Sequence, residues 1–220
     1  IMSAIALAAI LEFEIILDDE ILYLDNKYIN IASKIDTISN QVVFELYSLY
    51  LKDLNFLFDG KVKIDYFNEK IDYYGNFYYE NLQSNINVEM TKKIAKFYLV
   101  SEPFKSLKFL KNFLHLPNIA ESWMYDNVKG DIKIEELYAE YDLINNHIIE
   151  NSIQGKAQIK DAKIRFHKDV DAVNTKSLDI FFKDNRLHFN LMEPMFKDKK
   201  LDGSFVLINN LTSEKNGQVD

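Results

Sequence analysis

The segment SLDIFFKDNRLHFNL, residues 177–191, decides the fold of this chain. Its apolar residues recur at every second position on both sides of Asp184-Asn185. Alternation of this kind around a tight Asp/Asn turn is typical of two antiparallel strands joined in a hairpin. Similar short segments continue through residues 130–220. The sequence therefore predicts a mainly β fold, a long curved antiparallel meander that forms an open apolar groove.

Most turns are expected at Asn and Asp, because the chain of 220 residues holds only 6 Gly and 3 Pro. Asn and Asp tolerate left-handed backbone and bond their own main chain. The candidate turns before residue 100 are Asp25-Asn26, Asp59-Gly60 and Asn68-Glu69, and Asn145-Asn146 follows later. Asp59-Gly60 is the strongest hairpin signal among them. Residues 38–52 fit either a strand or a helix.

A short two-helix insertion is predicted at about residues 103–128. Ser101-Glu102-Pro103 supplies a capping residue and a first-turn proline ahead of apolar residues with helical spacing from Phe104 to Leu114. Pro117-Asn118 then opens a second helix that carries Trp123, and Gly130 follows its end. Two short helices therefore interrupt the strands.

A β-bulge is predicted near Lys160-Asp161. Ala157 and Ile159 share one parity, whereas Ala162, Ile164 and Phe166 share the other. One extra residue would return both groups to the same face of the sheet.

The apolar residues on that face are the candidate functional surface. An ordinary core covered by a helix or a second sheet is the alternative, but only two short helices are available as a cover. Charged residues such as Lys163, Arg165, Asp179 and Lys183 occupy the other parity. The predicted groove face consists of Ile159, Ile164, Phe166, Leu178, Ile180, Phe182, Leu187, Phe189 and Leu191.

No catalytic, metal or cofactor motif accompanies the strands. The four histidines, His115, His147, His167 and His188, lack the spacing of a metal pair, and His188 lies opposite the apolar parity of its strand. Cysteine is absent, and no phosphate loop or nucleophile elbow occurs. The net charge of -8 argues against nucleic acid. We therefore expect no enzyme, no metal and no cofactor.

The chain is expected to be one β-rich segment, residues 1–220, taken from a longer polypeptide, which the resemblance described below implies to be an envelope protein. Ile1 is not an initiator, and Asn216-Gly217 is a hairpin turn without a following strand. The apolar residues 1–11 are fewer than the roughly 20 that a membrane-spanning helix needs. A buried strand is favoured there over the remnant of a signal or membrane segment.

Residues from about 100 to 220 resemble the periplasmic region of AsmA-like proteins, in the YhdP-like branch. The resemblance rests on Leu116-Pro117 before Trp123, on Gly130 before a strand, and on three strand segments. These segments are GKAQIKDAKIRF (155–166), LDIFFKDNRL (178–187) and LDGSFVLI (201–208), the last leading into Asn210-Leu211.

The resemblance implies a non-enzymatic periplasmic portion of an inner-membrane-anchored protein that bridges phospholipid toward the outer membrane. It implies phospholipid or another acyl-chain lipid as partner, and a membrane attachment through segments outside this sequence. The alternative is a structural or protein-binding β-rich module with a closed core and no lipid. Lipid identity, transport direction and protein partners are left open by the sequence.

Overall fold

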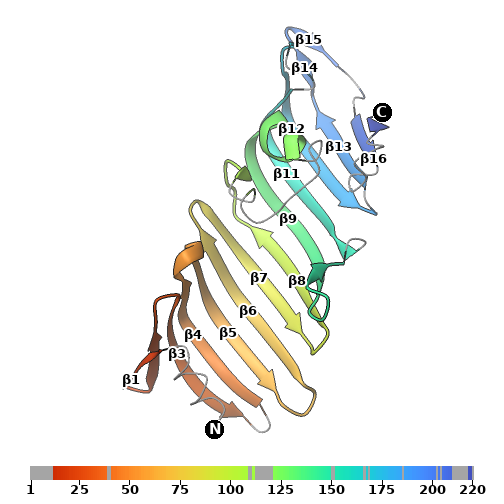
Figure 1. Ribbon diagram of the computed structural model, residues 1–220. Helices are drawn as coiled ribbons and strands as arrows, with labels where there is room; N and C mark the ends of the chain where they lie inside the picture. Colours follow the sequence, from red (N-terminus) through yellow and green to blue (C-terminus); the bar gives the residue numbers. More distant parts are fainter. Residues whose placement is uncertain are drawn as a thin grey trace. The chain divides into compact units, whose positions relative to one another are not determined.

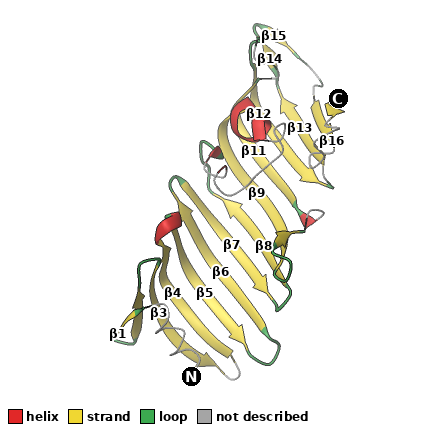
Figure 2. Ribbon diagram, in the orientation of Figure 1, coloured by secondary structure: helices red, strands yellow, loops and turns green. Residues whose placement is uncertain are grey.

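The computed structural model describes residues 12–38, 41–108, 111, 121–149, 152–165, 167, 169–184, 186–201, 203, 205–209 and 218–219 (Figure 1). Strands dominate these residues, and Figure 2 shows how little helix lies between them. The helical elements are η1 (Lys52–Leu54) and the π-type turn η3 (Trp123–Asn127). The strands are β1 (Glu14–Asp18), β2 (Ile21–Asp25), β3 (Ile29–Ile38), β4 (Gln41–Leu51), β5 (Phe56–Asp65), β6 (Lys70–Tyr79), β7 (Leu82–Met90), β8 (Ile94–Ser101), β9 (Val128–Asp142), β10 (His147–Ile148), β11 (Gln154–Ile164), β12 (Val173–Lys183), β13 (Arg186–Met192), β14 (Met195–Phe196), β15 (Lys199–Lys200), β16 (Phe205–Asn209) and β17 (Gln218–Val219).

The predicted fold class is confirmed: the protein is mainly β, with open antiparallel sheet. The chain divides into two compact units at Phe97, and residues 142–145 belong with the first of them. We call these the N-terminal and the C-terminal unit. The idea of a single continuous β-rich segment stays a prediction, as does the structure of residues 1–11, which lie outside the described residues. None of the helices in the described ranges is both long and apolar enough to span a bilayer.

The N-terminal unit is a meander in which consecutive strands from β1 to β7 pair antiparallel (Figure 1). Asn and Asp make its turns as the composition predicts. The Oδ1 atom of Asn26 accepts bonds from the main-chain N–H groups of Tyr28 and Ile29, at 2.8 and 2.7 Å. The Oδ1 atom of Asp65 accepts from Phe67 and Asn68 in the same way. Each carboxylate or amide thus replaces a main-chain partner at the strand end.

The predicted hairpin at Asp59-Gly60 is wrong, because β5 runs straight through these residues. Gly60 lies directly opposite Gly75 of β6. A Cβ atom on Gly75 would come within 1.9 Å of the main-chain oxygen of Asp59. The glycines therefore allow two backbones to approach closely, which is the other role of glycine inside a strand. The ambiguous segment 38–52 is mostly strand β4.

The C-terminal unit departs from a simple meander. β11 pairs with β9 on one side and β12 on the other, and β13 pairs with β12 and then with β16. The short β14 and β15 form a side hairpin that pairs with the start of β12. The predicted bulge is confirmed. The register of β11 with β9 shifts between Lys160 and Lys163, and Asp161 adopts a φ of 49°.

Within the described part of the insertion, residues 108 and 111 have 3-10 conformation, and a longer helical stretch occurs only at the end. Residues 121 and 122 are α-helical and lead into η3, in agreement with the second predicted helix. Phe104 instead forms an isolated bridge, and it exchanges main-chain hydrogen bonds of 2.8 Å with Ile132. Its buried ring, 5% exposed, is therefore held against the sheet by strand-like pairing. Residues 105–107 are not helical either, so the start of the first predicted helix is wrong, and residues 109–110 and 112–114 of that helix fall outside the described residues.

Candidate functional site

Eight of the nine predicted groove residues are apolar positions of β11, β12 and β13, and the ninth, Phe166, lies outside the described residues. Residues directly opposite each other on antiparallel strands point to the same face. Ile159 of β11 lies opposite Leu178 of β12 and opposite Ile132 of β9. Between β12 and β13, the opposed pairs are Leu178 with Leu191, Ile180 with Phe189, and Phe182 with Leu187.

The bulge at Asp161 brings the second half of β11 to the same buried side. Ala162 and Ile164 are each 1% exposed, whereas Lys160 and Lys163 are exposed. We call the eight described residues the C-terminal apolar face: Ile159, Ile164, Leu178, Ile180, Phe182, Leu187, Phe189 and Leu191.

Burial divides the C-terminal apolar face into two groups. The exposed fraction of the first group is 3% for Ile159, 1% for Ile164, 0% for Leu178 and 2% for Phe189. The second group is half-buried and consists of Ile180, Phe182, Leu187 and Leu191. The first group is therefore covered within the sheet, whereas the second keeps part of its apolar surface accessible.

The other face of the same strands is polar with one aromatic cluster. His188 lies on this face as its parity predicts, yet it is half-buried between two rings. Its ring centroid lies 6.3 Å from that of Phe181 and 5.7 Å from that of Phe205. Lys156 forms an ion pair of 2.6 Å with Glu135. Among the described residues, no group of three His, Asp or Glu side chains could hold a metal ion.

A second and larger apolar face lies in the N-terminal unit, and the sequence reasoning missed it. Opposed residues form apolar ladders across successive strands of the meander. One ladder crosses from β1 to β7 through Ile15, Leu24, Ile31, Leu49, Phe58, Phe77 and Ser84. Another crosses from β3 to β7 through Ile35, Phe44, Val62, Tyr73 and Val88. We call the residues of these two ladders, with Phe56 and Tyr79 beside them, the N-terminal apolar face.

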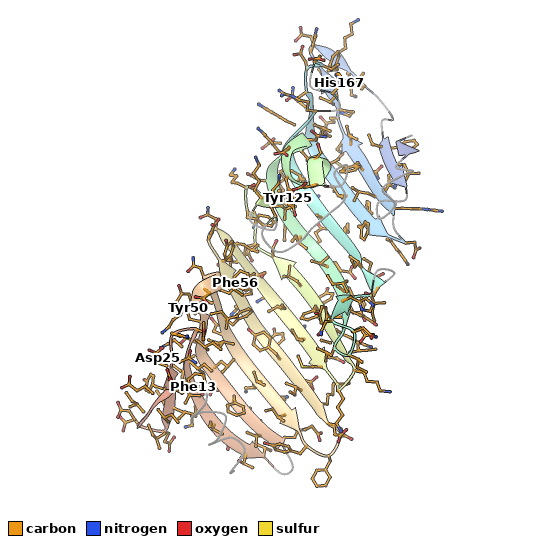
Figure 3. The ribbon with its side chains drawn as sticks, in the orientation of Figure 1. Phe13, Asp25, Tyr50, Phe56, Tyr125 and His167 are labelled. Carbon is orange, nitrogen blue, oxygen red and sulfur yellow. The ribbon has the colours of Figure 1, made fainter. Side chains whose placement is uncertain are left out.

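Most of the large side chains of the N-terminal apolar face are half-buried, and they contact one another edge-on. The ring centroid of Phe56 lies 5.1 Å from those of Phe77 and Tyr79, and Phe58 lies 5.0 Å from Phe77. Figure 3 labels Phe56 beside η1, the only helix that the described residues of this unit form. No described helix is long enough to cover the ladders.

The Tyr73 side chain occupies the space beside Gly75, where the glycines Gly60 and Gly75 leave this face without side chains. Its hydroxyl oxygen lies 2.8 Å from the main-chain oxygen of Asp59 and 2.9 Å from that of Asn76, so it donates a hydrogen bond there. A Cβ atom on Gly75 would lie 2.6 Å from the same hydroxyl. Burial, followed by the negative charge of Asp59, raises the pKa of the Tyr73 phenol above its ordinary value.

The Tyr73→Phe variant is expected to lose about 1 kcal/mol of unfolding free energy at neutral pH, the usual worth of one hydrogen bond. Since the folded pKa is raised, the stability that this phenol contributes is complete below its unfolded pKa of about 10. It is lost as pH rises beyond that value. Urea unfolding at pH 8 and pH 11 should therefore show a smaller alkaline loss in the variant. Tyr74→Phe, which removes a phenol that is 66% exposed, is the control and should behave as the parent at both pH values.

Comparison with known proteins yields one family match. Residues 114–220 match the family model described as YhdP protein, and all of this range except residues 142–145 lies within the C-terminal unit. No curated protein and no solved structure matches the chain significantly. The matched range contains the C-terminal apolar face and nearly all of the region whose strand pattern carried the resemblance. The match therefore supports the resemblance of residues 114–220 to the YhdP-like branch of the AsmA-like proteins.

Proposed function

We propose that this chain is a non-enzymatic segment of a periplasmic bridge that carries phospholipid, or another acyl-chain lipid, toward the outer membrane. The bridge is anchored in the inner membrane through other parts of the protein. The acyl chains lie on the N-terminal and C-terminal apolar faces, and water and charged side chains occupy the opposite faces. The family match supports this proposal, because the resemblance to AsmA-like proteins implies an envelope protein that transports lipid.

The observation that carries the proposal is the apolar ladder from Ile15 to Ser84. Six of its seven members are large apolar residues, and Ser84 is 2% exposed at its end. Each acyl CH₂ group removed from water is worth about 0.8 kcal/mol, so a two-chain lipid needs an apolar lining that is not interrupted. Rings and aliphatic chains on six successive strands, β1 to β6, supply such a lining.

A structural or protein-binding module with a closed core is the second candidate, and one observation favours it. Phe189 is 2% exposed and Leu178 is 0% exposed, so the middle of the C-terminal apolar face is already covered. Leu187 is half-buried and keeps part of the face accessible. In this candidate, the apolar residues serve only the stability of the sheet.

The test is mass spectrometry of organic extracts from the purified chain and from two variants of adjacent residues. Ile180→Asp places a carboxylate on the half-buried part of the C-terminal apolar face. Phe181→Asp places the same carboxylate on the opposite face, where Phe181 is 36% exposed. We expect phospholipid in the parent and in Phe181→Asp, and at least a fivefold depletion in Ile180→Asp.

Circular dichroism must show that both variants keep their strand content. Equal lipid in the two folded variants would contradict the assignment of the C-terminal apolar face. Absence of lipid from the parent as well would favour the closed-core module.

A further inference from the structure

A cavity of about 490 Å³, lined by both charged and apolar residues, lies within the C-terminal unit, where residues 105–108 pass the start of β9 and the bulge of β11. Its volume is within the range of small-molecule sites in proteins, roughly 300 to 1,000 Å³. The charged residues that line it are Lys105, Lys108, Lys129, Lys160, Asp131 and Asp161.

Positive charge is in excess in the wall of this cavity, although the whole chain carries a net charge of -8. Lys105 forms an ion pair with Asp131, and the Lys108 ammonium lies 3.1 Å from a carboxylate oxygen of Asp126. Within the described part of the chain, no ion pair is found for Lys129 or Lys160. Lys160 lies directly opposite Asp131 of β9, and Lys129 contributes to lowering the pKa of Asp126. The four lysines of the wall nevertheless outnumber its two aspartates.

The strand register adds an independent sign of missing negative charge. Lys129 of β9 lies directly opposite Lys163 of β11. Like charges at directly opposed positions of antiparallel strands repel each other and destabilise the pair. An anion bound beside Lys129 would offset this repulsion.

Tyr125 of η3 also lines the cavity and is 3% exposed. Figure 3 labels it beside the start of β9. Its hydroxyl has no hydrogen-bond partner within the described ranges. Burial raises the pKa of the Tyr125 phenol, so the group keeps its proton and can donate it to an acceptor. A buried donor without an acceptor is uncommon in proteins and calls for a ligand or water.

We propose that this cavity binds a phosphoryl anion, with Lys129 and Lys160 as its charge partners and the Tyr125 hydroxyl as a donor. The apolar part of the wall connects the site to the lipid surface. Ile132 lines the cavity and lies directly opposite Ile159 of the C-terminal apolar face. This row of opposed residues continues through Leu178 to the half-buried Leu191, where the chains of a phospholipid held by its headgroup in the cavity would meet accessible apolar surface. This lipid form of the proposal rests on the proposed function, whereas binding of free phosphate does not.

Isothermal titration of the whole chain with inorganic phosphate, and separately with monomeric dihexanoyl phosphatidylglycerol, tests the site. The test variant is Lys129→Gln with Lys160→Gln. The control is Lys183→Gln with Lys199→Gln, which removes the same charge from exposed positions of the same unit. We expect at least a tenfold loss of affinity for both probes in the test variant and less than a twofold change in the control.

The outcomes separate the site from the proposed function. Competition between phosphate and the short-chain lipid supports a headgroup site. Phosphate binding that depends on Lys129 and Lys160, without any lipid binding, supports a free-phosphate site and contradicts lipid binding by this unit. Equal affinities in the test variant and the control, or no binding of either probe, overturns the site. Lipid retention that still depends on Ile180 would in that case leave the proposed function standing.

Discussion

Replacing Gly75 with alanine is expected to lower the unfolding free energy of the N-terminal unit by about 3 kcal/mol, which is large for the addition of one methyl group. The new Cβ atom would lie 1.9 Å from the main-chain oxygen of Asp59 and 2.6 Å from the Tyr73 hydroxyl. The first contact is with backbone in the adjacent strand, so it cannot be relieved by a side-chain rotation. β5 and β6 must move apart at the centre of the aromatic ladders.

Urea unfolding followed by far-ultraviolet circular dichroism measures this effect. Gly155→Ala is the matched control, because Gly155 also lies inside a strand and its nearest neighbour would be the Glu136 main-chain oxygen at 3.1 Å. We expect the control to change the unfolding free energy by no more than about 1 kcal/mol. A Gly75→Ala chain as stable as the control would show that β5 and β6 do not approach closely at Gly60 and Gly75.

The turns and the fold class could be predicted because both depend on local sequence. Asn26 and Asp65 accept main-chain hydrogen bonds from residues two and three positions later, so the signal lies within four residues. The alternation in residues 177–191 is equally local, and it reappears as the register of β12 with β13. The bulge at Asp161 could be predicted for the same reason, since the change of parity is visible within the sequence of one strand.

Asp59-Gly60 shows why local reasoning fails elsewhere. The dipeptide is typical of a tight turn, but its role here is set by Gly75, which is 15 positions later and directly opposite. Phe104 is a similar case. Its predicted helical position is replaced by pairing with Ile132 across the sheet. In both cases a partner distant in sequence decides the structure, and no pattern within one segment reveals it.

The N-terminal apolar face was missed although its strands carry a usable signal. Phe56, Phe58, Val62 and Ile64 alternate cleanly once β5 is read as one strand, but the supposed turn at Asp59-Gly60 divides the pattern. In β4, register shifts between Leu46 and Leu49 hide the common parity. Small residues such as Ser84 also weaken the apolar pattern. Only the strand register shows that these positions form continuous ladders.

Periodicity also could not separate covered from accessible residues on the C-terminal apolar face. Leu178 and Leu187 have the same residue type and the same parity in adjoining strands. Leu178 lies on a central strand, directly opposite Ile159 on one side and Leu191 on the other, and it is fully buried. Leu187 lies near the β12–β13 turn and is half-buried. The difference comes from position in the sheet, which the sequence pattern does not contain.

The same pair of leucines provides the second large effect. Leu178→Ala is expected to lower the unfolding free energy by about 3 kcal/mol, because a fully buried leucine leaves a cavity between Ile159 and Leu191 that the strands fill only in part. Leu187→Ala removes the same atoms from a half-buried site, and about 1 kcal/mol is expected. Urea unfolding of both variants, with lipid removed beforehand, measures the two losses.

The expected effects on lipid content are the reverse of those on stability: Leu187→Ala should lose lipid, and Leu178→Ala should not. Leu187 belongs to the accessible part of the face, so its alanine variant should keep its fold and hold less phospholipid than the parent. The Leu178→Ala chain, studied at a temperature where it remains folded, should hold as much as the parent, since acyl chains do not reach that side chain. If Leu178→Ala lost lipid and Leu187→Ala did not, the lipid would have to enter the covered centre of the sheet, and the division of the C-terminal apolar face into stabilising and lipid-contacting residues would be wrong.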